Sequence, residues 1–184
     1  MRLKRKFFDR STVVVARNLL GKYLCRRISD RTVRVKITET EAYCGSSDLA
    51  CHASKGLTPR TKIMFGRAGH AYVYMIYGMY HCLNVVTGKE GYPSAVLIRA
   101  AEIQNSKIKN KNYNSKFKNL RGPGILCREL KINRELNGAD ICSSKELWVE
   151  DPIEKIKPSQ IKKGKRIGVD YAGKWKDKLW RFYI

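Results

Sequence analysis

A glutamate, a histidine and several tyrosines lie close together in residues 38–84 of this 184-residue sequence. Glu41 stands two positions before Tyr43 in an alternating stretch, so both side chains should face the same way. His52 follows in a loop, and Tyr72 and Tyr74 should share a face of the next strand. Aromatic faces can enclose a planar ring and attract a cationic one, and a neighbouring carboxylate can deprotonate water. An ordinary aromatic core beside a surface glutamate has the same spacing.

The charge distribution sets this segment apart from the rest of the chain. The whole sequence has 38 Lys and Arg against 16 Asp and Glu, a net charge of +22, whereas residues 38–84 are nearly neutral. So large an excess points to phosphate contacts or an anionic surface, although a lysine-rich solvated surface gives the same count. Together with the pocket residues, it suggests chemistry on a base of a polyanion.

Length and composition indicate one globular domain, since 43% of the residues are hydrophobic. No apolar run approaches the roughly 20 residues of a membrane span, and the basic N-terminus lacks the apolar stretch of a signal peptide. We therefore expect a cytoplasmic protein without a membrane partner.

The six cysteines include no CxxC pair. Cys51-His52 and His81-Cys82 are adjacent pairs rather than usual zinc-ligand spacings. We therefore expect reduced thiols in apolar packing and no metal site.

The elements that must position these residues can be read from the pattern. Ser11 can cap a helix that runs to about residue 24. Residues 33–37 alternate as a strand, and their inward parity extends to Glu41, which should therefore project from the same face at the edge of the core. An inward carboxylate needs a physical reason.

Further along the chain, residues 71–86 predict an aromatic strand region interrupted at residues 77–79, where Gly78 suits a hairpin or a bulge. Residues 94–101 predict an apolar strand with Arg99 in its middle, and a cation there requires a carboxylate or a ligand.

The second half of the chain gives weaker signals. The polar residues 106–119 predict a mobile surface loop. Residues 122–124 should open a short helix with Leu126 and Leu130 turned inward. Residues 166–184 resemble two short strands on either side of Ala172-Gly173.

Seven segments resemble those of the alkyladenine DNA glycosylases, the family that removes 3-methyladenine and related purines. They are TETEAY, DLACH, YVYMIYGMYHCLNV, AVLIRA, GPGILCRELKIN, RIGVDYAGKW and RFYI, in the order of the family. The run YVYMIYGMY is highly specific, whereas GPG alone would be a weak signal.

The resemblance implies a mixed α/β (α+β) fold in a single domain over residues 1–184. It implies a curved antiparallel sheet, surrounding helices and a protruding β-hairpin that enters the DNA minor groove. The implied enzyme is a monofunctional, monomeric base-excision-repair glycosylase without cofactor or metal, which flips alkylated or deaminated purines from double-stranded DNA. In a bacterium it would be associated with the nucleoid.

The resemblance also implies a role for particular residues. Glu41 matches the general base that activates the attacking water, and Arg99 matches the arginine that holds this water and orients the carboxylate. Asn84 matches the residue under the purine that screens against guanine. The walls that stack against or contact the flipped base are matched by Tyr43, His52 and Tyr74. The wedge that fills the gap in the helix is matched by Tyr77. Its neighbours at the DNA surface are matched by Met79 and Tyr80.

Two other classes of function are alternatives to this one. A non-catalytic basic nucleic-acid-binding protein would account for the charge, but not for an inward Glu41 beside Arg99. A zinc nuclease or deaminase is disfavoured because the sequence lacks HxE with CxxC. The chain departs from animal members of the family in a longer loop at residues 87–94 and in the polar His81, and we expect such differences to affect the range of substrates.

Overall fold

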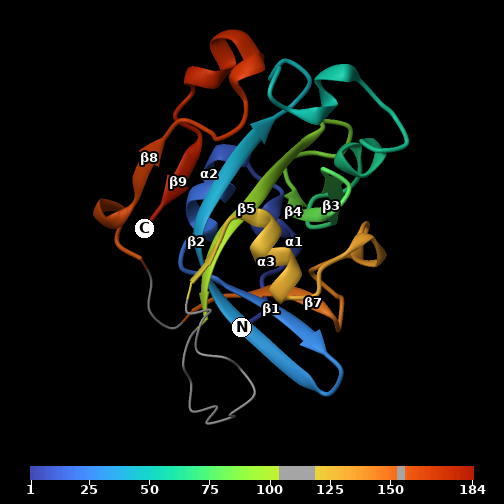
Figure 1. Ribbon diagram of the computed structural model, residues 1–184, viewed down its shortest axis with the longest axis vertical. Coiled ribbons are helices and arrows are strands. Elements are labelled where there is room, and N and C mark those ends of the chain that lie inside the picture. Colours follow the sequence, from blue (N-terminus) through green and yellow to red (C-terminus); the bar gives the residue numbers. More distant parts are fainter. Residues whose placement is uncertain (104–118, 153–155) are drawn as a thin grey trace.

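A large open antiparallel sheet organises the chain, as the computed structural model shows for residues 1–103, 119–152 and 156–184 (Figure 1). The main path of the sheet runs β3-β4-β5-β2-β1-β7, with β6 on β5, β9 on β2 and β8 on β9. The strands are β1 (Tyr23–Ile28), β2 (Arg31–Cys44), β3 (Ala71–Ile76), β4 (Tyr80–Val86), β5 (Ser94–Ile103), β6 (Asn119–Arg121), β7 (Leu147–Glu150), β8 (Lys162–Gly164) and β9 (Arg181–Tyr183).

Short helices complete the domain. The α-helices are α1 (Arg5–Phe8), α2 (Thr12–Leu19) and α3 (Pro123–Glu129). The 3-10 turns are η1 (His52–Lys55), η2 (Lys62–Phe65), η3 (Arg134–Leu136), η4 (Pro158–Gln160) and η5 (Asp170–Asp177). In Figure 1, α3 lies in front of β5 and α2 lies behind β2. The predicted α+β class with a single domain is confirmed.

The two faces of the central strands have different environments. On β5, Val96 and Ile98 point into the main hydrophobic core, whereas Leu97 and Arg99 line a cavity on the other face. Strands β3 and β4 alternate in the same way, because side chains on a strand point alternately to opposite faces. One face of the sheet is therefore packed core, and the other carries the candidate site.

An irregularity in β2 decides which of its residues face the cavity. Its pairing with β5 shifts register between Ile37 and Glu39 and again between Glu39 and Thr40. An extra residue at such a bulge reverses the alternation of every side chain that follows. Beyond the shift, Thr40 is fully buried and donates its hydroxyl hydrogen to the carbonyl oxygen of Ala16 in α2, 2.8 Å away.

The predicted face of Glu41 was therefore wrong, although its burial was right. Ile37 and Ala42 belong to the same core cluster, so the intervening Glu41 lies on the opposite face from residues 33–37. Strict alternation along the sequence gives the wrong parity because register shifts depend on the partner strand.

The N-terminal helix is shorter than predicted. It follows Ser11 as expected, but α2 ends at Leu19 and residues 23–28 form β1. Leu24 points into the core from a strand rather than from a helix. The prediction was too long because apolar residues continue from α2 into β1, and an apolar residue is equally suited to burial in a helix or in a strand.

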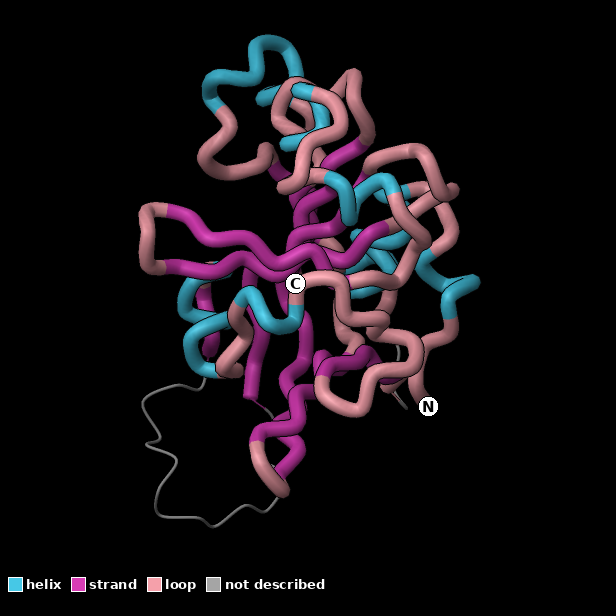
Figure 2. Tube along the Cα trace, turned by 90° about the vertical axis from the view of Figure 1, so that its right-hand side faces the viewer, coloured by secondary structure: helices cyan, strands magenta, loops and turns pink. Residues whose placement is uncertain are grey.

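The aromatic region forms the predicted hairpin, which extends away from the body of the molecule (Figure 2). The amide of Met79 donates to the carbonyl of Ile76, and the two residues between them, Tyr77 (φ 52°) and Gly78 (φ 69°), both have positive φ. Positive φ at both central residues is a requirement of the type I′ turns found in hairpins. Tyr77 therefore occupies a left-handed conformation that favours glycine.

The other predicted elements fared differently. Strand β5 and helix α3 form where expected, with Leu126 and Leu130 buried. Of the two strands expected on either side of residues 172–173, the later one forms as β9, but residues 166–171 form no strand: η5 begins at Asp170, and β8 ends before the predicted range. Except for Asn119, which begins β6, the predicted loop at residues 106–119 lies outside the described residues.

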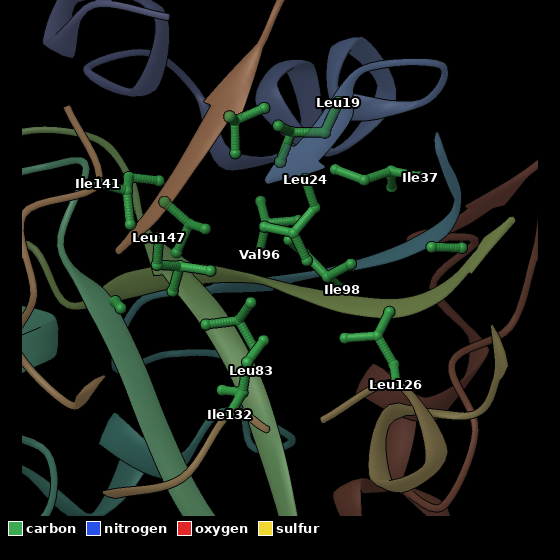
Figure 3. Packing of buried hydrophobic residues seen from close by; sticks show 14 of the residues in the cluster. Leu19, Leu24, Ile37, Leu83, Val96, Ile98, Leu126, Ile132, Ile141 and Leu147 are labelled. Atoms are coloured by element: carbon green, nitrogen blue, oxygen red, sulfur yellow. The ribbon is translucent and has the colours of Figure 1, made fainter. Parts of the chain in front are cut away.

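The core packs aliphatic side chains from several elements against one another (Figure 3). Ile98 is fully buried on β5, in the middle of this packing and on the face away from the cavity. Truncation of such a residue removes apolar contacts and leaves a cavity.

We predict that Ile98→Ala lowers the free energy of unfolding by about 2–5 kcal/mol. Leu57→Ala is the matched control, because the Leu57 side chain is exposed and its truncation should have little effect. Urea or thermal unfolding of the two variants measures the difference. Equal stability of both variants would contradict the assignment of the core face.

Candidate active site

A cavity of about 210 Å³ opens on the face of the sheet opposite the main core. Its floor comes from β3, β4 and β5, and its sides come from the end of β2, from η1 and from the segment before η5. Five of the predicted pocket and catalytic residues line it, together with the predicted wedge: Tyr43, His52, Tyr74, Asn84 and Arg99, with Tyr77 at the mouth. The fold thus brings residues from distant parts of the sequence around one hollow.

The carboxylate of Glu41 is completely buried (0% exposed) and does not itself line the cavity, but its three partners Tyr43, Arg99 and Ile167 do. The hydroxyl of Tyr43 donates to Oε2 at 2.7 Å, and the amide of Ile167 donates to Oε1 at 2.9 Å. The Nε of Arg99 is 3.5 Å from Oε1. The Nε–H of Arg99 is donated to Glu39, so Glu41 accepts two hydrogen bonds and, with about four acceptor sites, has capacity left for a water molecule.

The surroundings of Glu41 affect the pKa of its carboxyl group in opposite directions. Burial raises the pKa of its carboxyl group, while the charge of Arg99 and the hydrogen bonds from Ile167 and Tyr43 lower it. Arg99 thus favours the ionised carboxylate, but burial has the larger effect. The carboxyl group is therefore easier to protonate than an ordinary glutamate, which increases its strength as a base once it is ionised.

Arg99 is held between two acids. Its Nε donates to Oε1 of Glu39 at 3.1 Å, and Nη1 of Arg181 reaches the same oxygen at 3.1 Å. Glu39 therefore fixes the guanidinium that faces Glu41. The sequence-based prediction that Arg99 needs a carboxylate partner is confirmed, with Glu39 as the nearer of two acids.

His52 forms one wall of the cavity, at the start of η1. Its Nδ1 is 3.0 Å from the hydroxyl of Tyr72, and its ring meets the ring of Tyr74 edge-on at 4.5 Å between centroids. Burial and the nearby charges of Arg60 and Lys55 lower the pKa of His52 to about 4. The imidazole is therefore neutral at physiological pH and is not placed to act as a general acid.

Tyr72 and Tyr74 share a face of β3, as predicted, with ring centroids 5.2 Å apart. The guanidinium of Arg60 lies 5.1 Å from the Tyr74 ring centroid. Such a cation on an aromatic ring is attracted to its π electrons and holds the ring in place. The cavity therefore has a rigid aromatic side.

Asn84 lies on the cavity floor, on β4. Its side-chain amide donates to the backbone carbonyl of Tyr72, its cross-strand neighbour, at 3.1 Å. This bond fixes the orientation of the amide, because the Nδ2 group is directed toward the backbone of β3. The side chain is almost fully buried and lines the cavity.

The hairpin tip carries three exposed apolar side chains. Tyr77 is 86% exposed, and Met79 and Tyr80 are also exposed. Tyr80 leans on the start of α3, where a Cβ on Gly124 would come within 3.0 Å of its ring. Met79 and Tyr80 do not line the cavity and lie beside it at the tip. An exposed aromatic in a strained backbone conformation is costly, so it points to a function.

Sequence reasoning missed several residues that build the site. Ile167, whose amide binds Glu41, and the exposed Tyr171 at the cavity mouth come from the segment RIGVDYAGKW. Asp48 and Arg166 form a fully buried ion pair behind the cavity wall. The segments DLACH and RIGVDYAGKW had been recognised, but only as markers of resemblance, because contacts between residues more than 100 positions apart leave no local pattern.

Three other properties of the described residues bear on the chemistry. Among residues 1–103, 119–152 and 156–184, no three His, Cys, Asp or Glu side chains gather in a way that could hold a metal ion. The six cysteines are unpaired, and burial raises the pKa of the Cys51 thiol to about 11. None of the helices in these ranges is long and apolar enough to cross a membrane.

A buried carboxylate beside an aromatic cavity, next to a projecting hairpin on a strongly basic protein, is an arrangement suited to excising a base from DNA. Comparison of the sequence with protein families agrees: the model of methylpurine-DNA glycosylases matches residues 6–184. The chain belongs to the methylpurine-DNA glycosylase family and is a DNA glycosylase of base-excision repair. The comparisons support this function over the non-catalytic alternative.

Individual relatives match over nearly their whole length. The chain is 54% identical over 187 residues to a protein of Methanocella arvoryzae, covering 98% of this chain and 91% of the relative. It is 50% identical over 183 residues to a protein of Legionella pneumophila strain Lens, covering 100% and 94%. Both relatives bear the name "Putative 3-methyladenine DNA glycosylase".

Proposed function

We propose that this DNA glycosylase removes 3-methyladenine and related alkylated or deaminated purines from double-stranded DNA by hydrolysis with one activated water. The observation that carries the proposal is the buried Glu41 carboxylate, held by two hydrogen-bond donors and the charge of Arg99 beside an aromatic cavity. Residues 1–184 act as one catalytic domain and as a monomer. The enzyme works on DNA in the cytoplasm, or on the nucleoid of a bacterial cell.

In the proposed reaction, Glu41 accepts a proton from the water as its oxygen bonds to C1′ of the flipped nucleotide. The bond from C1′ to the purine breaks, and its electron pair leaves with the base. Arg99 holds the water and keeps the carboxylate ionised by its positive charge. No metal, cofactor or covalent enzyme intermediate takes part.

The chemistry of the lesion explains why so little acid catalysis is built into the site. Alkylation at N3 places positive charge on the purine, which weakens the glycosidic bond and lets the base leave as a neutral molecule. The Tyr43, His52 and Tyr74 walls favour such a cationic ring. A neutral lesion such as hypoxanthine needs a proton, and the neutral His52 does not supply it.

The hairpin supports the opening of the duplex. Tyr77 is proposed to fill the gap left by the flipped nucleotide, with Met79 and Tyr80 beside it at the DNA surface. Insertion of an apolar side chain offsets part of the unstacking cost. The large net charge of +22 supports phosphate contacts on both sides of the lesion.

We expect Glu41→Gln to retain the fold and the binding of DNA but to lose at least about 100-fold in excision rate, because the amide cannot accept the proton. The assay measures release of free base from methylated duplex DNA with EDTA present, under single-turnover conditions. Wild-type activity that survives EDTA excludes a zinc enzyme. A Gln variant that is as fast as wild type would remove Glu41 from the role of general base.

We expect Tyr77→Ala to weaken binding to damaged duplex and to slow excision from it, because no side chain then occupies the gap left by the flipped nucleotide. The loss should be larger on duplex than on single-stranded substrate, which has no opposing stack to fill. Leu49→Ala serves as the control for loss of an exposed apolar side chain away from the hairpin. An equal loss on both substrates would show that Tyr77 acts only in the fold.

We expect Asn84→Ser to raise excision of guanine-type bases relative to hypoxanthine, because the Asn84 amide is proposed to crowd the 2-amino group that guanine carries. Rejection by steric exclusion is effective when normal bases vastly outnumber lesions. The measurement is the ratio of single-turnover rates on matched duplexes that contain guanine or hypoxanthine. An unchanged ratio would place the selection elsewhere in the pocket.

A further inference from the structure

A buried ion pair that the proposed reaction does not use lies behind the wall of the cavity. Asp48, in the loop after β2, and Arg166, after β8, pair through the two terminal nitrogens of the guanidinium, at 2.5 Å and 2.9 Å, and both side chains are completely buried. Neither residue lines the cavity. Burying two charges is costly, so this pair requires an explanation beyond simple packing.

The pair is tied into the backbone on both sides. Asp48 also accepts the amide hydrogens of Cys44 at 3.0 Å and Ala50 at 3.1 Å. Arg166 also donates to the carbonyls of Ala42 at 2.9 Å and Trp175 at 3.1 Å. The end of β2 and the C-terminal segment are therefore locked together at this point.

Arg166 also supports an aromatic wall of the cavity from behind. Its guanidinium carbon lies 4.9 Å from the ring centroid of Tyr43 and 5.1 Å from that of Trp180. Since Tyr43 lines the cavity and Arg166 does not, the cation lies behind that wall. A planar guanidinium between two rings fixes both of them.

Both groups that Arg166 holds are donors to the same carboxylate. The hydroxyl of Tyr43 binds Oε2 of Glu41, and the amide of Ile167, the residue next to Arg166, binds Oε1. One buried guanidinium therefore connects to each of the two oxygens of Glu41 through a different neighbour.

We propose that Arg166, held by Asp48, is a positioning residue for base excision, which keeps the Tyr43 hydroxyl and the Ile167 amide on the two oxygens of Glu41. The inference rests on the proposed role of Glu41 as the general base. It adds that the Asp48–Arg166 pair, behind the cavity wall, controls the ionisation and the orientation of this carboxylate without contacting DNA.

Other charged and titratable groups also face Glu41. Arg99 approaches it from β5, Glu39 precedes it on β2, and Cys82 on β4 lies close enough to interact with it electrostatically. An Arg166→Lys substitution leaves these groups in place and keeps the positive charge behind the wall. A change in Glu41 would then report the loss of its two positioned donors.

Lysine at position 166 can neither form a bidentate pair with Asp48 nor stack a planar group between the rings of Tyr43 and Trp180. We expect the acidic limb of the single-turnover excision profile to move to higher pH by about one unit, because loss of donors to the ionised carboxylate raises the pKa of Glu41. The plateau rate should fall by roughly 10-fold as the carboxylate loses its aim. Affinity for undamaged duplex should not change.

A second readout does not depend on activity. The carboxyl carbon of Glu41 can be followed by NMR in protein labelled at glutamate side chains, with the signal identified by its absence in Glu41→Gln. The titration midpoint should move upward in Arg166→Lys. Arg5→Lys is the matched control: it weakens the Arg5–Asp140 pair (2.5 Å), remote from the site, and should leave both readouts unchanged.

Trp180→Leu provides a gentler variant should Arg166→Lys fail to fold. It removes one of the two rings around the guanidinium and keeps the pair itself, so a smaller shift in the same direction is expected. A folded variant with the wild-type titration of Glu41 and the wild-type acidic limb would overturn the positioning role. A wild-type enzyme inert on methylated DNA would instead overturn the proposed function, and the NMR titration would still decide whether Arg166 positions the carboxylate.

Discussion

The burial of one carboxylate sets the terms for the rest of this structure. Glu41 has no exposed surface, and an uncompensated charge in such a place would be very unfavourable. Its partners therefore come from three parts of the chain: hydrogen-bond donors from Tyr43 on β2 and Ile167 after β8, and a positive charge from Arg99 on β5. The sheet order, with β5 and β9 both beside β2, brings these parts together.

The same constraint explains the unusual features of β2. In a regular strand, Glu41 would share the face of Ile37, because the two residues are four positions apart, and it would then point into the aliphatic core. The register shifts turn Glu41 to the cavity and Thr40 to the core, where a backbone carbonyl satisfies its hydroxyl. A local irregularity in strand pairing thus separates the chemistry from the packing.

The acidic residues around the candidate site contrast with the strongly basic composition of the whole chain. The chain carries +22 overall, yet the carboxylates that matter most, Glu39, Glu41 and Asp48, each meet a guanidinium at close range inside the protein. Pairing with a guanidinium offsets part of the cost of removing these carboxylates from water. A basic exterior for a polyanion and an acidic interior for hydrolysis are therefore compatible in one small domain.

The sequence by itself determined the α+β class, the hairpin, the strand around Arg99 and the family, because these depend on local patterns and on specific runs such as YVYMIYGMY. It did not determine the end of α2, the 3-10 turns near residue 172 or the face of Glu41. Only the tertiary structure decided these, since apolar residues suit a helix or a strand equally and register depends on the partner strand. The contacts of Ile167 and Arg166 likewise required the fold, because they join residues separated by more than 100 positions.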